Sequence, residues 1–258
     1  MIRSIILAAG KGERLMPLTA DKPKCLVPLL GRSLIERQIA TFRSAGVNDI
    51  TIVGGYQADQ LGTLGQPVIV NPDFEVTNMV ASLFCARDRL DGKADVIISY
   101  GDIVYETRVL DALFNCREEL CLTSDTQWCA YWRARMERPL ADVQTFKIGD
   151  GGWVTELGKK PESLESIQGQ YMGLFKVRAD QVPKLVDAYD AMDRSAHYDG
   201  KNFDNMFMTS FLQHLIDMGW SVRAVPVDGG WLEVDTADDL ARYERLHWQG
   251  KLDRFFRL

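Results

Sequence analysis

The chain has 258 residues, of which 46% are hydrophobic and 26% are charged, and its formal net charge at pH 7 is −6. This length and composition allow a large buried core, so we expect one globular domain over residues 1–258. The acidic balance argues against nucleic acid as a partner, because proteins that bind phosphate backbones usually carry a basic face. No apolar run approaches the ~20 residues that span a bilayer, and the glycine-rich amino-terminal stretch does not resemble a secretion signal. We therefore expect a cytoplasmic protein without a membrane partner.

The cysteines are scattered along the chain without a CxxC motif. Their positions are Cys25, Cys85, Cys116, Cys121 and Cys129. This spacing suggests neither a zinc site nor a disulfide framework. We expect reduced thiols, most of them packed in the interior.

The first part of the chain alternates between predicted strands and predicted helices. Hydrophobic runs predict strands over residues 2–9, 49–56 and 94–102. Helical spacing predicts helices over 33–46 and 78–90. In the first helix, Ser33 and Glu36 have the spacing of a capping box, and Gly46 marks its end. The alternation predicts parallel strands joined by helices, as in a doubly wound sheet.

After about residue 125 the pattern changes. The segments that follow are a hairpin over 142–160 that turns at 149–152, a strand over 169–177, helices at about 178–193 and 203–218, strands over 221–227 and 230–235, and a helix over 236–248. The whole predicts an α/β fold: a Rossmann-like, mixed and mostly parallel sheet sandwiched by helices. We expect residues of about 125–200 to form a small subregion that binds a second ligand.

One loop carries the strongest functional signal. It is the stretch LAAGKGERLMPLTADKPKCLVPLLG, Leu7–Gly31, which directly follows the first strand. Ligands of open α/β sheets bind at that end of a strand, where small residues let backbone N–H groups approach an anion. Arg14 and Lys24 add positive charge. The pattern GxxxxGK[ST] is absent and GxGxxG is broken at Leu15, which disfavours a P-loop or a dehydrogenase.

This stretch resembles the signature LAAGxGxRxxPLTxxxPKxLxPxxG of the nucleotidyltransferases that activate sugar phosphates and choline phosphate. The resemblance implies a single Rossmann-like domain and an acceptor phosphate that attacks the α-phosphorus of a nucleoside triphosphate, with loss of pyrophosphate. It also implies that the backbone of Ala8–Gly10 meets the base and that Gly12 and Arg14 hold the β- and γ-phosphates. Lys24 would bridge the α-phosphate and the acceptor, so Lys24 and Arg14 are the catalytic candidates.

Two substrates that carry phosphate bring several negative charges together, so we expect Mg²⁺ held by carboxylates. Asp102 and Asp235 each follow a predicted strand and match the metal-binding positions of the family. Glu233 lies two residues before Asp235 and so points the same way along a strand, which makes it a candidate third ligand. Asp235 has an alternative role as the N-cap of the following helix, a role that Thr236 could also fill.

The segment NPDFEVTNMVASLFCA resembles the cytidylyltransferases that act on choline phosphate and on aminoalkyl phosphonates. Asn78 and Ser82, together with Gly54–Tyr56, could therefore read the edge of cytosine, although Asn78 could equally cap a helix. The expected donor is CTP. The candidate nucleotide-binding residues are Leu7, Ala8, Ala9, Gly10, Gly12, Gly55, Asn78, Ser82 and Gly101.

The segment LGKKPE has Lys159 where sugar nucleotidyltransferases have a glutamate that grips sugar hydroxyls, which puts a sugar acceptor in doubt. Lysines there suit a phosphate or carboxylate, and aromatic faces with acidic neighbours suit an ammonium group. Core packing is the alternative role of each aromatic ring. The candidate acceptor-binding residues are Lys159, Lys160, Glu156, Tyr171, Trp128, Trp132 and Asp204.

Together these features predict an enzyme that transfers CMP from CTP to a small phosphate or phosphonate monoester, such as phosphocholine, 2-aminoethylphosphonate or a phosphorylated amino acid or amide. The first alternative is a sugar-1-phosphate nucleotidyltransferase that serves surface polysaccharide synthesis. The second is a nucleotide-binding regulator without activity, which the joint presence of Arg14, Lys24, Asp102 and Asp235 disfavours. Phe255 and Phe256 could pack either on the domain or on a second copy in a homodimer.

Overall fold

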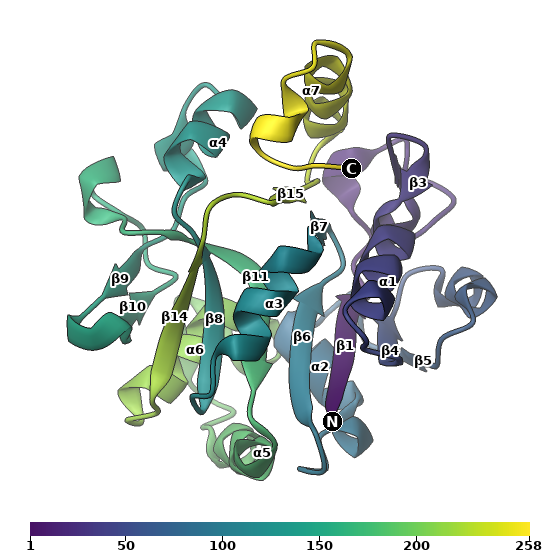
Figure 1. Cartoon of the computed structure of the whole chain (residues 1–258). Coiled ribbons are helices and arrows are strands. Elements are labelled where there is room, and N and C mark those ends of the chain that lie inside the picture. The colour runs from purple at the N-terminus through teal and green to yellow at the C-terminus, as the bar shows by residue number, and fades with distance from the viewer.

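A computed structural model describes residues 1–258. Its centre is a seven-stranded sheet in the order β14-β8-β11-β6-β1-β4-β5 (Figure 1). The strands are β1 (Ile2–Ala8), β4 (Asp49–Gly54), β5 (Val68–Val70), β6 (Asp95–Tyr100), β8 (Leu120–Asp125), β11 (Gln170–Val177) and β14 (Val222–Val227). Only β11 runs against its neighbours β6 and β8, and the other pairs are parallel. The predicted mixed, mostly parallel sheet is confirmed.

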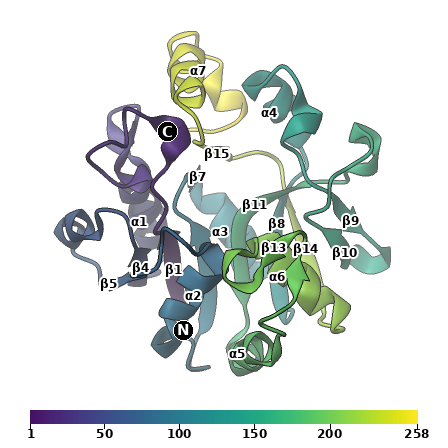
Figure 2. The same ribbon diagram turned by 180° about the vertical axis from the view of Figure 1, so that it is seen from behind.

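Helices cover both faces of this sheet. One face carries α1 (Leu34–Ser44) and α3 (Thr107–Asn115), and the other carries α2 (Met79–Cys85), α5 (Val182–Ala191) and α6 (Met208–Asp217) (Figures 1 and 2). Two further helices, α4 (Trp128–Arg135) and α7 (Ala237–Trp248), lie beyond the carboxyl ends of the parallel strands (Figure 1). The buried apolar side chains accordingly form two clusters, one on each side of the sheet.

Capping boxes define the start of two helices. Ser33 Oγ accepts from the backbone N–H of Glu36, and the Glu36 carboxylate accepts from the backbone N–H of Ser33, as predicted. The same arrangement joins Thr236 and Asp239 at the start of α7. Thr236 is therefore the N-cap of α7, and Asp235 is not. Its carboxylate is left for another role.

Short paired strands surround the main sheet. They are β2 (Pro28–Leu29) with β3 (Arg32–Ser33), β7 (Ile103–Tyr105) with β15 (Trp231–Glu233), β9 (Phe146–Ile148) with β10 (Val154–Leu157), and β12 (His197–Tyr198) with β13 (Lys201–Asn202). The β9–β10 pair is the predicted hairpin, and Gly151 and Gly152 at its turn have positive φ. The β7–β15 pair joins segments that are far apart in the sequence, which matters for the site below.

Several helices are shorter than the sequence predicts. The helices predicted at about 178–193 and 203–218 begin with 3₁₀ turns, Ala179–Gln181 and Phe203–Asn205, which precede α5 and α6. A further 3₁₀ turn, Arg87–Arg89, follows α2. Sequence analysis did not identify α3, α4, β5 or β8 as elements. Phe255 and Phe256 are both buried among residues of this chain, which answers the packing question in favour of the domain.

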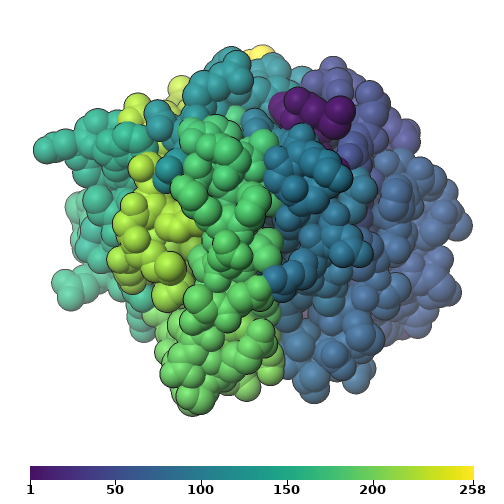
Figure 3. Space-filling view, turned by 90° about the horizontal axis from the view of Figure 1, so that it is seen from below, coloured from purple at the N-terminus to yellow at the C-terminus, as the bar shows by residue number.

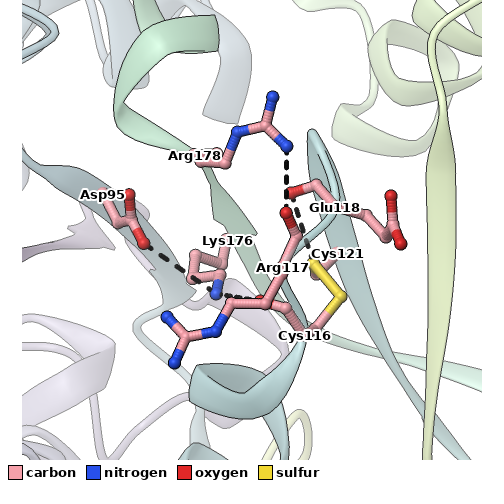
Figure 4. The surroundings of a disulfide bond; sticks show 7 residues. All are labelled: Asp95, Cys116, Arg117, Glu118, Cys121, Lys176 and Arg178. Carbon is pink, nitrogen blue, oxygen red and sulfur yellow. Dashed lines mark hydrogen bonds and ion pairs between the residues drawn. A yellow bond between two sulfur atoms is a disulfide. The ribbon is translucent and has the colours of Figure 1, made fainter.

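The expectation of five reduced thiols is wrong for one pair. Cys116, directly after α3, and Cys121, the second residue of β8, form a disulfide (Figure 4). Lys176 donates to the carbonyl oxygen of Cys116 and lies 3.9 Å from a carboxylate oxygen of Asp95. The remaining thiols, Cys25, Cys85 and Cys129, are free.

The amino ends of the parallel strands lie on the face that Figure 3 shows, where purple, blue and green segments from different parts of the chain lie next to one another. The carboxyl ends lie on the opposite side, beneath α4 and α7 (Figure 1). No helix of the structure combines the length and the apolar character that crossing a membrane requires.

Candidate active site

A hollow of about 420 Å³ opens at the carboxyl ends of β1 and β6. The predicted residues that line it are Leu7, Ala8, Ala9, Gly10, Gly12, Arg14, Lys24, Asn78, Ser82, Gly101, Asp102 and Asp235. The structure thus brings together the loop residues, the two aspartates and the residues from α2. Sequence reasoning missed other lining residues: Glu13, Cys25, Phe74, Thr77 and Met79.

Two glycines allow the loops at this edge to pack closely. Gly12 has φ = +70°, and a Cβ at this position would lie 2.8 Å from Cβ of Lys24. A Cβ on Gly55 would lie 2.7 Å from the carbonyl oxygen of Ala9. Because any larger residue would clash, both glycines set the backbone path of the site. Gly55 supports the loop from outside and does not line the hollow.

Lys24 lies between two carboxylates. Its Nζ donates to Oδ2 of Asp102 at 2.7 Å and to Oδ1 of Asp235 at 2.8 Å. Burial by itself would lower the pKa of Lys24, but the charges of the two aspartates outweigh it and raise that pKa above its usual value. Lys24 therefore remains a cation at every physiological pH. Arg14, which is mostly exposed, pairs with the other oxygen of Asp235.

The fold explains why Asp102 and Asp235 meet although they are far apart in the chain. Asp102 follows β6 and precedes β7, while Asp235 follows β15. Strands β7 and β15 pair with Ile103 opposite Glu233, and the N–H of Val234 donates to the carbonyl oxygen of Asp102 at 2.9 Å. This short antiparallel pair fixes both carboxylates beside Lys24.

The two aspartates fit a divalent cation. Asp102 Oδ1 is buried and has no hydrogen-bond partner in the protein, and carboxylate oxygens are the ligands that Mg²⁺ prefers. The structure does not gather a cluster of three His, Cys, Asp or Glu side chains suited to a metal, so Glu233 is not grouped with them as a third ligand. Its carboxylate instead pairs with Arg135 from α4.

Charged groups of both signs surround Glu233. Burial raises the pKa of Glu233 to about 7, and the charges of Asp102 and Asp235 act in the same direction, while Arg135 opposes them. Arg135 is also held by Asp239 of α7, with Nε 2.8 Å from Oδ1. Glu233 therefore lies between the two aspartates and a buried arginine.

Asn78 and Ser82 lie at the wall of the hollow that α2 forms. The side-chain oxygen of Asn78 accepts from the N–H of Met79 at 2.8 Å, so Asn78 does cap this helix. Ser82 is buried and accepts from Nδ2 of Asn71 at 3.0 Å. The helix-cap role of Asn78 is confirmed, and both side chains still border the space in which a base would bind.

A second hollow, of about 180 Å³, adjoins the first and shares Arg14, Met79 and Asp235 with it. Trp132 and Tyr171, two of the predicted acceptor-binding residues, line it together with Glu233. Sequence reasoning missed other polar or aromatic lining residues: Tyr100, Asp142, Gln144, Gln170, Phe207, Thr209 and Trp231. In the sequence they look like ordinary strand and helix residues, and no motif marks them.

The other predicted acceptor-binding residues line neither hollow. They are Trp128, Glu156, Lys159, Lys160 and Asp204. Nζ of Lys159 pairs with Asp199 at 2.5 Å, and Glu156 pairs with Lys147 of the same hairpin at 3.0 Å. Trp128 is buried in the core, and Lys160 and Asp204 are exposed.

A glycine-rich loop follows the first strand, and a buried lysine of this loop pairs with two aspartates at the carboxyl end of a mostly parallel sheet. This arrangement is expected of a nucleotidyltransferase. The sequence pattern of the MobA-like NTP transferase domain matches residues 4–189. The chain therefore belongs to the family of MobA-like NTP transferases.

Several relatives of this chain are cytidylyltransferases. The chain is 42% identical over 248 residues to the CTP:phosphoglutamine cytidylyltransferase of Campylobacter jejuni, an alignment that covers 93% of this chain and 98% of the relative. It is 25% identical to the 2-aminoethylphosphonate cytidylyltransferase of Lancefieldella rimae, over 93% of this chain and 91% of that one. The solved CTP:phosphocholine cytidylyltransferase of Streptococcus pneumoniae has the same fold, with a TM-score of 0.70 at 21% identity, over 95% of this chain and 99% of that chain.

Proposed function

We propose that this chain transfers CMP from CTP to phosphoglutamine or a chemically similar phosphorylated amide and releases pyrophosphate. The observation that carries the proposal is the pair of adjoining hollows that share Arg14 and Asp235, a larger one at the glycine loop and a smaller one beside it. This arrangement provides room for two substrates whose phosphates meet at the shared residues. The similarity to a phosphoglutamine enzyme over nearly the full length of both chains supports the choice of acceptor.

In this mechanism the larger hollow holds the nucleotide. The backbone of Ala8–Gly10 and the wall formed by Asn78 and Ser82 enclose the base, and Gly12 and Arg14 contact the β- and γ-phosphates. These contacts orient the α-phosphorus toward the smaller hollow. Transfer of this kind depends on positioning and charge neutralisation more than on covalent chemistry.

Asp102 and Asp235 would hold Mg²⁺, which supplies charge neutralisation between the acceptor and the triphosphate when it is bound. Lys24 would turn from these carboxylates to the α-phosphate and the attacking oxygen, where its positive charge stabilises the negative charge of the transition state. The acceptor phosphate is already anionic at neutral pH, so the chain needs no strong general base.

Two further expectations belong to this proposal. CTP is a metabolite of the cytoplasm, which favours a cytoplasmic location for the enzyme. The partners that the reaction requires are CTP and the acceptor.

A pyrophosphate-release screen tests the proposal. The purified chain is incubated with each of the four nucleoside triphosphates and with phosphoglutamine, choline phosphate, 2-aminoethylphosphonate or glucose-1-phosphate, and products are identified by ³¹P NMR. We expect the highest kcat/KM for CTP with phosphoglutamine. Equal turnover with UTP would contradict the choice of CTP, and a preference for glucose-1-phosphate would favour the sugar enzyme.

A further inference from the structure

Side chains of α4 and α7 hold the segment that leads to Asp235. The backbone N–H of Glu233 donates to Oη of Tyr131 at 2.9 Å, and the carbonyl oxygen of Glu233 accepts from Oη of Tyr243 at 2.7 Å. The two hydroxyl oxygens lie 2.6 Å apart. Because Tyr243 gives its proton to the carbonyl oxygen, Tyr131 must donate the proton that joins the two hydroxyls. Both backbone polar groups of Glu233 are therefore bound by helices outside the main sheet.

Arg135 of α4 binds carboxylates on both sides of Asp235. Its guanidinium donates to the carboxylate of Glu233, two residues before Asp235. It also donates to both carboxylate oxygens of Asp239, four residues after Asp235, at 2.8 and 3.2 Å. The side chain of Arg135 is 2% exposed, so these ion pairs are screened little by salt. One buried group thus ties the residues that flank Asp235 to α4.

Asp239 also binds the main chain of Asp235 directly. Its Oδ2 accepts from the backbone N–H of Asp235 at 2.9 Å and from that of Thr236 at 2.8 Å. Asp239 therefore connects the guanidinium of Arg135 to the main chain of Asp235. The side chain of Asp235 starts from this fixed main chain and has Oδ1 2.8 Å from Nζ of Lys24.

The contacts between β7 and β15 stop one residue before Asp235. The paired residues of β15 end at Glu233, and the N–H of Val234 still reaches the carbonyl oxygen of Asp102. The N–H of Asp235, in contrast, has its partner in α7. Both α4 and α7 lie beside β15, beyond the carboxyl ends of the parallel strands (Figures 1 and 2). The two helices therefore hold the main chain at the point where the strand contacts end.

We propose that Tyr131, Arg135, Asp239 and Tyr243, which we call the clamp, are positioning residues for Asp235. The clamp holds the main chain so that the carboxylate of Asp235 stays beside Lys24 and at the proposed Mg²⁺ site. This inference rests on the proposed function, which assigns Asp235 to the metal. Partners that orient a metal ligand without touching the metal typically change metal affinity or activity about tenfold to a hundredfold when they are removed.

The test measures metal binding in clamp variants. Asp239→Ala removes the acceptor of the Asp235 N–H and the partner of Arg135. Thr236→Val is the matched control, because it removes the other half of the same capping box, the hydroxyl that accepts from the N–H of Asp239, and leaves Oδ2 of Asp239 in place. Tyr243→Phe removes only the hydroxyl that binds Glu233 and keeps the ring. For each protein, Mn²⁺ binding in the presence of CTP is measured by electron paramagnetic resonance, together with kcat and the thermal melting profile.

We expect Asp239→Ala to weaken Mn²⁺ binding and to lower kcat about tenfold to a hundredfold. Tyr243→Phe should change both quantities in the same direction and by less. Thr236→Val should have a lower melting temperature, because it loses a helix cap, while its Mn²⁺ affinity and kcat stay close to those of the wild type.

A folded Asp239→Ala variant that binds Mn²⁺ as tightly as the wild type does would overturn the inference and leave the proposed function standing. Equal losses of Mn²⁺ affinity in Asp239→Ala and Thr236→Val would also overturn it, because the start of α7 would then explain the effect. Unchanged Mn²⁺ binding in Asp235→Ala would instead remove the metal assignment of the proposed function. If Asp239→Ala does not fold, Tyr243→Phe decides, and wild-type Mn²⁺ affinity in that variant overturns the inference.

Discussion

Charged side chains gather at both ends of the parallel strands, which we call the carboxyl edge and the amino edge of the sheet. The two groups differ in what surrounds them. At the carboxyl edge, Lys24 joins Asp102 and Asp235 at the wall of a 420 Å³ hollow, and one carboxylate oxygen stays unpaired. At the amino edge, Arg3 joins Asp49 and Asp91, at 3.0 Å each, where it is buried and lines neither hollow.

The ion pairs of Lys24 can be exchanged for contacts with a ligand, whereas those of Arg3 stabilise the fold. In the proposed reaction Lys24 leaves its carboxylates for the substrate phosphates, whose negative charge replaces that of the carboxylates. Arg3 lines neither hollow, so no ligand there can replace its carboxylate partners. Its guanidinium also donates to the carbonyl oxygen of Arg89. We therefore expect changes at the carboxyl edge to alter turnover and changes at the amino edge to alter stability.

The largest effect is expected for Lys24→Met. The change keeps most of the side-chain bulk and removes the positive charge. In the proposed reaction this charge interacts more strongly with the phosphate oxygens in the transition state than in the ground state. Loss of one such donor typically costs about 2.7–4 kcal/mol, or roughly a hundred- to a thousandfold in kcat. CTP affinity, measured by calorimetry without acceptor, should fall much less.

Lys22→Met is the matched control for this prediction, because Lys22 lies in the same loop and pairs only with Asp21. It should keep nearly normal turnover. If Lys24→Met instead abolishes CTP binding and leaves kcat at saturation unchanged, Lys24 is a binding residue, and catalysis must be assigned to Arg14 and the metal.

The next largest effect is expected for Asp102→Ala and Asp235→Ala. Each change removes a ligand of the proposed Mg²⁺ site, so most Mg²⁺-dependent activity should be lost, and Mn²⁺ binding in the presence of CTP, followed by electron paramagnetic resonance, should weaken. Since Thr236 caps α7, the melting profile of Asp235→Ala should remain native. Asp238→Ala, an exposed position in the same helix, serves as the control. Unchanged Mn²⁺ binding in either site variant would exclude that residue as a ligand.

A smaller effect, on stability alone, is expected at the Cys116–Cys121 disulfide. The bond closes a loop of five residues' separation beside the start of β8, and cross-linking a loop this short stabilises a fold by about 2 kcal/mol in the chain-entropy account. Cys116→Ser combined with Cys121→Ser should lower the free energy of unfolding by this order and leave the KM for CTP unchanged. Cys85→Ser, at an exposed free thiol, should change neither quantity. A large loss of turnover in the double variant would contradict the separation of the two edges.

The smallest effect is a pH dependence at Asp91. The backbone N–H of Lys93 donates to its carboxylate and, with Arg3, lowers the pKa of Asp91 to about 2. Because the pKa is lower in the folded state, Asp91 stabilises the fold above about pH 4, and this contribution disappears as the pH falls toward 2. The melting temperature of the wild type should exceed that of Asp91→Asn at pH 7 and approach it near pH 2. Asp88→Asn, an exposed neighbour outside the ion pairs, should show no such convergence.

Sequence analysis predicted the carboxyl edge better than any other part of the molecule. The Leu7–Gly31 loop is one continuous segment, and its glycines, prolines and cations have a physical reason that local sequence reveals. Asp102 could be found because it follows the recognisable strand β6, and parallel strands end at the same edge. Asp235 follows the stretch predicted as a strand over 230–235, of which the structure forms β15. The sequence does not show that β15 pairs with β7 outside the main sheet, because β7 has three residues and carries almost no pattern.

The acceptor side was predicted less completely for a different reason. Gln170 begins a strand and Trp132 lies in a helix, and nothing in the sequence shows that the two residues line one hollow. That property depends on every neighbour in three dimensions. Lys159 was chosen because it replaces a glutamate of the sugar enzymes, but its side chain pairs with Asp199 on another segment. The disulfide was missed because a pair of cysteines five residues apart has no characteristic motif.

The pairing of Lys24 with Asp235 has a consequence for the synthesis of the chain. These residues are 211 positions apart, whereas β1, β4, β5 and β6, adjacent in the sheet, are all complete by Tyr100. On the ribosome, half of the sheet can assemble long before Asp235 is translated. Until then Lys24 faces Asp102 alone, so a growing chain has its nucleotide loop but only one of the two aspartates. Activity therefore begins only when the segment that carries β15 has emerged and paired with β7.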